Sequence, residues 1–142
     1  MKVRELMTGQ VIRIHPEEPV EVAARTLTQY NIGALPVCGW DGQVYGMVTD
    51  RDLVTRCMAA GRYAGSMKVR DVMTARVVSA RPDMEVAVAA SLMGRERVRR
   101  LPVLENGKLC GMVSLGDLAG REESVMDAAD ALTEISGNLT IE

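Results

Sequence analysis

The sequence predicts an α/β (α+β) fold made of two copies of one unit, and three observations support this prediction. A long internal repeat runs through the chain, each copy contains an amphipathic helical stretch, and each copy contains a strong hairpin turn signal. Each copy therefore reads as strand–helix–strand–strand–helix over roughly 50 residues. Because units this small rarely fold alone, we expect the two to pack about a pseudo-twofold axis.

The internal repeat also sets the expected domain boundaries. The segment VRELMT at residues 3–8 returns as VRDVMT at residues 69–74, and Leu-Pro-Val recurs at the same displacement. After a gap of one residue, GMVT at residues 46–49 is matched by GMVS at residues 111–114. We predict the first repeat at 1–60, a linker at 61–68, the second repeat at 69–120, and a C-terminal helix and tail at 121–142.

The first half of each copy is expected to be a strand followed by a helix. The short apolar strands are placed at residues 11–14 and 77–79. Glu17, Glu18 and Asp83 lie where acidic side chains favour a helix N-terminus. Apolar residues at helical spacing then define one buried face in each helix: Val20, Ala23, Ala24, Leu27 and Tyr30 in the first, and Val86, Ala89, Ala90 and Met93 in the second.

The second half of each copy is expected to be a hairpin followed by a second helix. Asp-Gly and Asn-Gly turns separate strands at 34–38 and 43–48, and at 100–104 and 108–113. Thr49 and Ser114 are suitable N-caps for the helices that follow. A last helix is expected over 121–135, with Val125, Ala128, Ala129, Leu132 and Ile135 on one stripe, and a loose tail over 137–142.

Composition argues against several function classes. The formal net charge is −2 and aromatic residues make up 3% of the chain, so neither a basic surface nor stacking platforms for nucleic acid are expected. No stretch approaches the roughly 20 apolar residues of a membrane span, and no signal peptide is evident, so we expect a cytoplasmic protein. Cys38, Cys57 and Cys110 form no CxxC pair, which favours free thiols and leaves a redox role as the alternative.

Catalysis and metal binding find little support in the sequence. The single histidine, His15, has Arg81 at the matching position of the second copy, which indicates a polar strand end rather than a general base. No cluster of His, Cys and carboxylate residues has the spacing of a zinc site. We therefore predict no enzyme activity and no required cofactor.

The repeated motifs resemble a known family. The VRELMT and VRDVMT openers, the Leu-Pro-Val strands and the paired Gly-x-x-[Thr/Ser]-x-x-Asp segments are similar to the tandem cystathionine-β-synthase (CBS) domain pair, or Bateman module. The resemblance covers residues 1 to 120, and the first repeat particularly resembles stand-alone bacterial members of the hypoxic-response type. It implies a regulatory module that binds an adenosine-containing ligand such as AMP, ADP, ATP or S-adenosylmethionine in a cleft between the repeats. It also implies a homodimer and a protein partner that receives the signal.

The candidate ligand residues come from both copies. A glycine, a hydroxyl and a carboxylate stand at a strand-to-helix junction, where free N–H groups and a ribose-binding carboxylate can meet a ligand: Gly46, Thr49 and Asp52, with Gly111, Ser114 and Asp117 as twins. The same Thr or Ser followed by Asp is equally an ordinary helix cap, and this alternative stays open. By the resemblance, Val11, Ile12, Val77 and Val78 neighbour the adenine, although valine there also suits a core.

The two copies differ in their cations. The second copy carries Arg99 and Arg100 where the first has neutral residues, and arginine suits phosphate because its planar fork donates hydrogen bonds in pairs. By resemblance to the gamma subunit of AMP-activated protein kinase, both arginines reach phosphates; a solvated basic edge is the alternative. The competing function is a non-catalytic assembly or redox-responsive dimerisation module with vestigial ligand sites.

Overall fold

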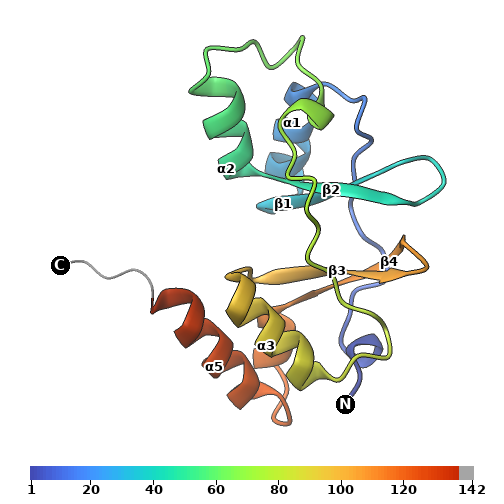
Figure 1. Ribbon diagram of the computed structural model, residues 1–142, viewed down its shortest axis with the longest axis vertical. Helices are drawn as coiled ribbons and strands as arrows, with labels where there is room; N and C mark the ends of the chain where they lie inside the picture. The colour runs from blue at the N-terminus through green and yellow to red at the C-terminus, as the bar shows by residue number, and fades with distance from the viewer. Residues whose placement is uncertain (138–142) are drawn as a thin grey trace. The chain divides into compact units, whose positions relative to one another are not determined.

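The computed structural model describes residues 1–137, and the chain forms two compact units within it (Figure 1). One unit, here the N-unit, is the continuous segment Ile12–Val77. The other, here the C-unit, joins Met1–Val11 to the chain from Val78 onward. Each unit therefore combines the opener of one sequence repeat with the helices and hairpin of the other. Residues 138–142 of the expected tail lie outside the described residues.

The predicted fold class is confirmed, because each unit pairs one two-stranded antiparallel hairpin with helices. The N-unit contains the helix α1 (Val20–Tyr30), the strands β1 (Ala34–Cys38) and β2 (Val44–Thr49), the short helix α2 (Asp50–Leu53), a π-helical turn η2 (Val54–Met58) and a 3₁₀ turn η3 (Val69–Asp71). The C-unit contains the 3₁₀ turn η1 (Val3–Glu5), α3 (Val86–Glu96), β3 (Arg100–Glu105), β4 (Lys108–Ser114), α4 (Leu115–Ala119) and α5 (Val125–Ser136).

The strands predicted at 11–14 and 77–79 were wrong, because only one bridge residue forms in the first segment and only the residue after the second segment forms one. Ile14 forms a parallel bridge to Val37, and Ala80 forms one to Val103. Toward each predicted strand, the next ladder bond would need the N–H of Pro36 or Pro102 in the partner strand, and on the other side of the bridge it would need the N–H of Pro16 or Pro82. Because proline has no N–H, the ladder stops after one residue.

Glu17, Glu18 and Asp83 lie outside the first turns of α1 and α3, which corrects the prediction for these three residues. Glu17, and Glu85 before α3, instead form ion pairs with the openers, whereas Asp83 pairs with Arg81. Residues 16–18 form a turn, and α1 begins only at Val20. The Glu17 carboxylate accepts from Lys68 Nζ at 2.7 Å and from Arg70 Nη1 at 2.6 Å. In the C-unit Glu85 pairs in the same way with Lys2 Nζ at 2.8 Å. Lys68 and Lys2 directly precede an opener and Arg70 belongs to one, so each ion pair fastens an opener to its unit.

Glu17 is expected to make stability pH-dependent. The hydrogen bond from Lys68, and then the charge of Arg70, lower its pKa from the ordinary value of 4.5. A carboxyl whose folded-state pKa is depressed adds stability above its unfolded value, and this stability is lost as pH falls through the folded-state pKa. Glu17→Gln should therefore reduce the loss of unfolding free energy, measured with urea, between about pH 5 and pH 3. Glu18→Gln, which removes no ion pair, should leave that acid limb unchanged; equal slopes in both variants would contradict the assignment.

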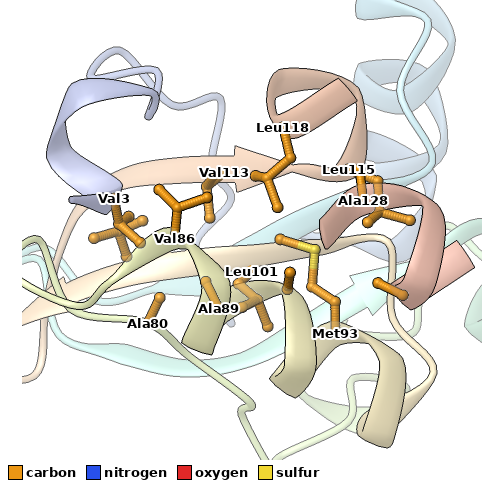
Figure 2. Close-up of a cluster of buried hydrophobic side chains, with 13 residues drawn as sticks. Val3, Ala80, Val86, Ala89, Met93, Leu101, Val113, Leu115, Leu118 and Ala128 are labelled. Atoms are coloured by element: carbon orange, nitrogen blue, oxygen red, sulfur yellow. The ribbon is translucent and has the colours of Figure 1, made fainter. Parts of the chain in front are cut away.

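The buried core of the C-unit gathers side chains from every element of that unit. Met93 of α3, Leu101 of β3 and Leu118 of α4 are fully buried and meet at its centre, and Figure 2 shows Met93 reaching between Leu101 and the helices α4 and α5. Val3 of the opener is equally buried in this cluster, as Val69 is in that of the N-unit. The openers are therefore parts of the cores.

Two predicted apolar stripes are only partly buried. Tyr30 ends the α1 stripe but is 48% exposed, because the helix leaves the core in its last turn and ends at Asn31 in a left-handed conformation. On α5, Ala128 and Ala131 are buried and Ile135 is partly buried. The remaining members of the predicted stripe, Val125, Ala129 and Leu132, are exposed.

Close packing on α3 determines which residues of the α5 stripe face the core. A methyl group at Gly94 of α3 would lie 3.3 Å from the Ala131 Cα and 2.5 Å from the Glu134 carboxylate. Because Gly94 lets α5 approach on this side, Ala131 replaces Leu132 at the contact. Among residues 1–137, no helix is long and apolar enough to cross a membrane.

Candidate functional site

The junction of β2 and α2 places a hydroxyl and a carboxylate side by side in the N-unit. Thr49 ends the strand and caps the helix, as predicted. Its hydroxyl oxygen accepts from the Asp52 N–H at 3.1 Å, and Asp52 Oδ2 accepts from the Thr49 N–H at 3.0 Å. This reciprocal capping box fixes both side chains. The Thr49 hydroxyl proton and Asp52 Oδ1 are not used by it.

The C-unit repeats this arrangement at the junction of β4 and α4. The Ser114 N–H donates to Asp117 Oδ2 at 2.8 Å, and the Asp117 N–H donates to the Ser114 hydroxyl at 3.2 Å. Both copies therefore realise the helix cap that the sequence left as an alternative. The cap leaves one carboxylate oxygen and one hydroxyl proton in each copy, so capping and ligand binding are compatible.

The two carboxylates differ in their surroundings. Asp52 is 8% exposed, and its Oδ1 lies 3.8 Å from Arg56 Nη1. Arg56 itself donates to the carbonyls of Val72 and Met73, both at 3.0 Å, so it fastens the opener to the N-unit. At the matching place in the C-unit, no hydrogen bond or ion pair engages Asp117 Oδ1 among the described residues. The Asp117 carboxylate is therefore the more available acceptor.

The two candidate glycines serve the openers. A methyl group at Gly46 would lie 2.6 Å from the Thr74 carbonyl oxygen, and one at Gly111 would lie 2.6 Å from Met7 Sδ. Beside each glycine an antiparallel bridge joins the hairpin to the opener, Met47 to Thr74 and Met112 to Thr8. The close approach that the glycines permit is thus occupied by protein backbone.

A groove opens in the C-unit beside Ser114. Its volume is about 560 Å³, and two of its lining residues are Arg99 and Arg100. No ion pair engages either guanidinium within the part of the chain that the structure describes. The remaining walls come from α4 and α5: Leu115, Gly116, Ala119, Val125, Ala128, Ala129 and Leu132. The structure thus brings Ser114 and both arginines to one groove.

The four valine and isoleucine candidates are partly buried. Val11 and Val78 belong to the C-unit, and Ile12 and Val77 to the N-unit. Ile12 and Val78 each pack against the core cluster of their unit, which fits the structural alternative for these two positions.

The remaining chemistry-bearing residues have structural partners. His15 stacks on the exposed Trp40, with ring centroids 4.1 Å apart, and its Nδ1 accepts from the Glu17 N–H at 3.2 Å. Burial raises the pKa of the Cys38 and Cys110 thiols, which lowers their thiolate fraction. Within residues 1–137, no three His, Cys, Asp or Glu side chains gather to hold a metal.

Two features of the site were missed from sequence. Arg56 follows Asp52 by four residues, a spacing at which helical side chains meet, and this was the available signal. The apolar wall from α5 was missed because helical spacing shows that these residues share one stripe but not which of them reach the core. No pattern in the sequence indicates the tilt that exposes half of it.

Comparison with known proteins identifies the family. The family model for the CBS domain matches residues 3–59 and 69–124. The chain is 41% identical over 134 residues to the CBS domain-containing protein YhcV of Bacillus subtilis, covering 94% of both chains. It is 30% identical over 116 residues to Hypoxic response protein 1 of Mycobacterium tuberculosis, covering 82% of this chain and 81% of that protein.

Solved structures agree with this assignment. The crystal structure of Hypoxic Response Protein I with two coordinated zinc ions superimposes with a TM-score of 0.79 at 29% identity, covering 85% of this chain and 98% of that one. The CBS domain pair of MJ0100, solved with 5′-methylthioadenosine and S-adenosyl-L-methionine, gives a TM-score of 0.75 at 23% identity, covering 84% and 94%. The latter likeness concerns the fold alone. The chain belongs to the CBS-domain family and carries two CBS domains in tandem.

Proposed function

We propose that this protein is a non-catalytic regulatory module that binds an adenosine-containing ligand and passes its presence to a protein partner. The observation that carries the proposal is the Ser114–Asp117 pair. Within residues 1–137 its capping bonds leave Asp117 Oδ1 without a partner, and Ser114 lines the groove that also contains Arg99 and Arg100. Carboxylates accept ribose hydroxyls, and each charge-assisted hydrogen bond contributes about 1.5–3 kcal/mol. Arg99 and Arg100 supply the cations that a phosphate requires.

We propose that the two copies bind different ligands. The C-unit, with its arginines, favours a phosphorylated ligand, AMP, ADP or ATP. The N-unit has no arginine at the matching positions, and Arg56 lies beside Asp52, so it favours a less charged adenosyl ligand such as S-adenosylmethionine or stays empty. Gly46 and Thr49 with Asp52, and Gly111 with Ser114 and Asp117, form the two junctions. Val11, Ile12, Val77 and Val78 neighbour the base.

We propose that the ligand signals by shifting the population between arrangements of the pair. A ligand that binds one arrangement of the pair more tightly favours it, and coupling energies of this kind are about 1–3 kcal/mol. We further propose a cytoplasmic homodimer that presents the selected arrangement to its partner. The CBS domain pair of MJ0100, which shares this fold, was solved with 5′-methylthioadenosine and S-adenosyl-L-methionine. The redox alternative gains no support from cysteines whose pKa burial raises.

Asp117→Asn is expected to abolish most of the adenylate binding. The amide oxygen still accepts from the Ser114 N–H, so the cap is kept, while the charge that recognises ribose is lost. We expect AMP affinity by isothermal titration calorimetry to fall about 10- to 100-fold, as loss of one charged hydrogen bond implies. A thermal-shift titration with AMP, ADP, ATP and S-adenosylmethionine would rank the ligands.

Two controls make this test decisive. Asp130→Asn changes an exposed aspartate of α5 that lies outside this groove and should leave AMP affinity unchanged. Asp52→Asn reports on the other copy and should leave the phosphorylated ligand unaffected. Absence of a shift with all four ligands, in a protein with an intact unfolding transition, would refute the adenylate proposal and favour the assembly module.

A further inference from the structure

The exposed half of the α5 stripe is the starting observation. Val125 is 41% exposed and Leu132 46% exposed, and both line the groove together with Ala129. These side chains belong to a well-packed helix, since Ala128 and Ala131 on the adjacent side are buried against the core. The groove therefore has a fixed apolar wall that is open to solvent.

The groove also has a cationic part. Arg99 and Arg100 line the same groove, and Ser114 adds a hydroxyl between them and α4. Since β3 begins at Arg100 and pairs it with Ser114, the hairpin fixes these residues at its end. The groove is thus amphipathic in cross-section, with charge at the hairpin and hydrocarbon along α5.

The volume and the charge of the groove limit which ligands it can bind. A volume of about 560 Å³ lies within the roughly 300–1,000 Å³ typical of small-molecule pockets. Two arginine forks favour a phosphate over a carboxylate because they can donate to several of its oxygens in pairs. Covering the exposed apolar surface of a groove with an apolar group lowers the free energy of the complex.

We infer that the groove binds an organic phosphate whose apolar body lies on α5 while its phosphate pairs with Arg99 and Arg100. The inference rests on the proposed function only in assigning phosphate to these arginines. It adds α5, which follows the residues matched by the CBS family model, as a specificity-determining element. An adenine ring and an aliphatic chain are the two sources of the apolar body.

The test measures binding of AMP, n-octyl phosphate below its micelle concentration and inorganic phosphate by calorimetry to the full chain. We expect n-octyl phosphate to bind at least about tenfold more tightly than inorganic phosphate, because its chain buries apolar surface on α5. Leu132→Glu places a carboxylate in the wall and should weaken n-octyl phosphate about tenfold or more. Arg99→Gln should likewise weaken binding of n-octyl phosphate about tenfold or more.

Matched variants separate these effects from general damage. Met126→Glu also introduces a carboxylate on α5, at a residue that is 70% exposed and lies outside this groove. Arg121→Gln removes an exposed arginine of the C-unit that also lies outside the groove. Both should bind like the wild type, and unfolding midpoints would confirm that all four variants fold.

The outcomes distinguish this inference from the proposed function. If Leu132→Glu weakens neither n-octyl phosphate nor AMP relative to Met126→Glu, the inference is overturned. If in addition AMP is weakened by Asp117→Asn alone, the proposed function stands without α5. If n-octyl phosphate shows the expected pattern and no adenylate binds, the inference stands and the adenylate proposal falls. Weakening of AMP by Leu132→Glu would place the adenine on α5.

Discussion

Leu101→Ala is expected to lower the free energy of unfolding by about 3–4 kcal/mol, as large-to-small changes at fully packed sites do. Leu101 is fully buried in β3 at the centre of the C-unit core, between α3 and the helices α4 and α5 (Figure 2). The loss combines the transfer free energy of the removed carbons with the cavity left behind. Urea unfolding followed by circular dichroism would measure it.

A milder change at the same position serves as the control. Leu101→Met keeps the side-chain volume, so its loss should stay below about 1.5 kcal/mol. Leu132→Ala, at a half-exposed position of α5, should lose still less. Equal losses for Leu101→Ala and Leu132→Ala would show that Leu101 does not lie at the centre of the core.

Gly46→Ala is expected to destabilise the N-unit by about 2–3 kcal/mol, at the upper end of what overpacking usually causes. The added methyl group would lie 2.6 Å from the Thr74 carbonyl oxygen, which is backbone and cannot rotate away. The bridge between Met47 and Thr74, whose N–H groups donate at 3.0 and 2.8 Å, must therefore open or shift. Faster amide hydrogen exchange at Met47 and Thr74 would report this directly.

Gly9→Ala is the matched change without a clash, since no atom lies within 4 Å of an added methyl group there. It should leave stability within about 0.5 kcal/mol of the wild type. Gly111→Ala should fall between the two, because the nearest atom to its methyl group is the sulfur of Met7, a flexible side chain. If Gly46→Ala behaves like Gly9→Ala, the opener is not fixed at Gly46.

The parts of the fold that local chemistry determines could be predicted from the sequence. The hairpins, the buried face of α3 and the caps at Thr49 and Ser114 depend on turn residues, helical spacing and hydrogen bonds between near neighbours. The pairs Thr49–Asp52 and Ser114–Asp117 lie within one turn of chain, so their geometry could also be predicted.

The rest depends on contacts between distant segments. The one-residue bridges at Ile14 and Ala80 reflect prolines whose effect on a ladder is visible only once its partner strand is known. Glu17 was assigned to a helix end because nothing local indicates Lys68 and Arg70 as partners. The exposed wall of α5 depends on how closely Gly94 lets the helix approach, which helical periodicity does not determine.

The exchange of openers makes the N-unit an insertion within the C-unit. The segment Ile12–Val77 is continuous, whereas Met1–Val11 and the chain from Val78 onward are separated by it. During synthesis, Val3 and its neighbours must wait for β4 and α3 to be made before their core site exists. The inserted segment can fold meanwhile, and its folding shortens the loop that the C-unit must close. The natural place to divide or permute this chain is therefore at 11/12 and 77/78, and not between its sequence repeats.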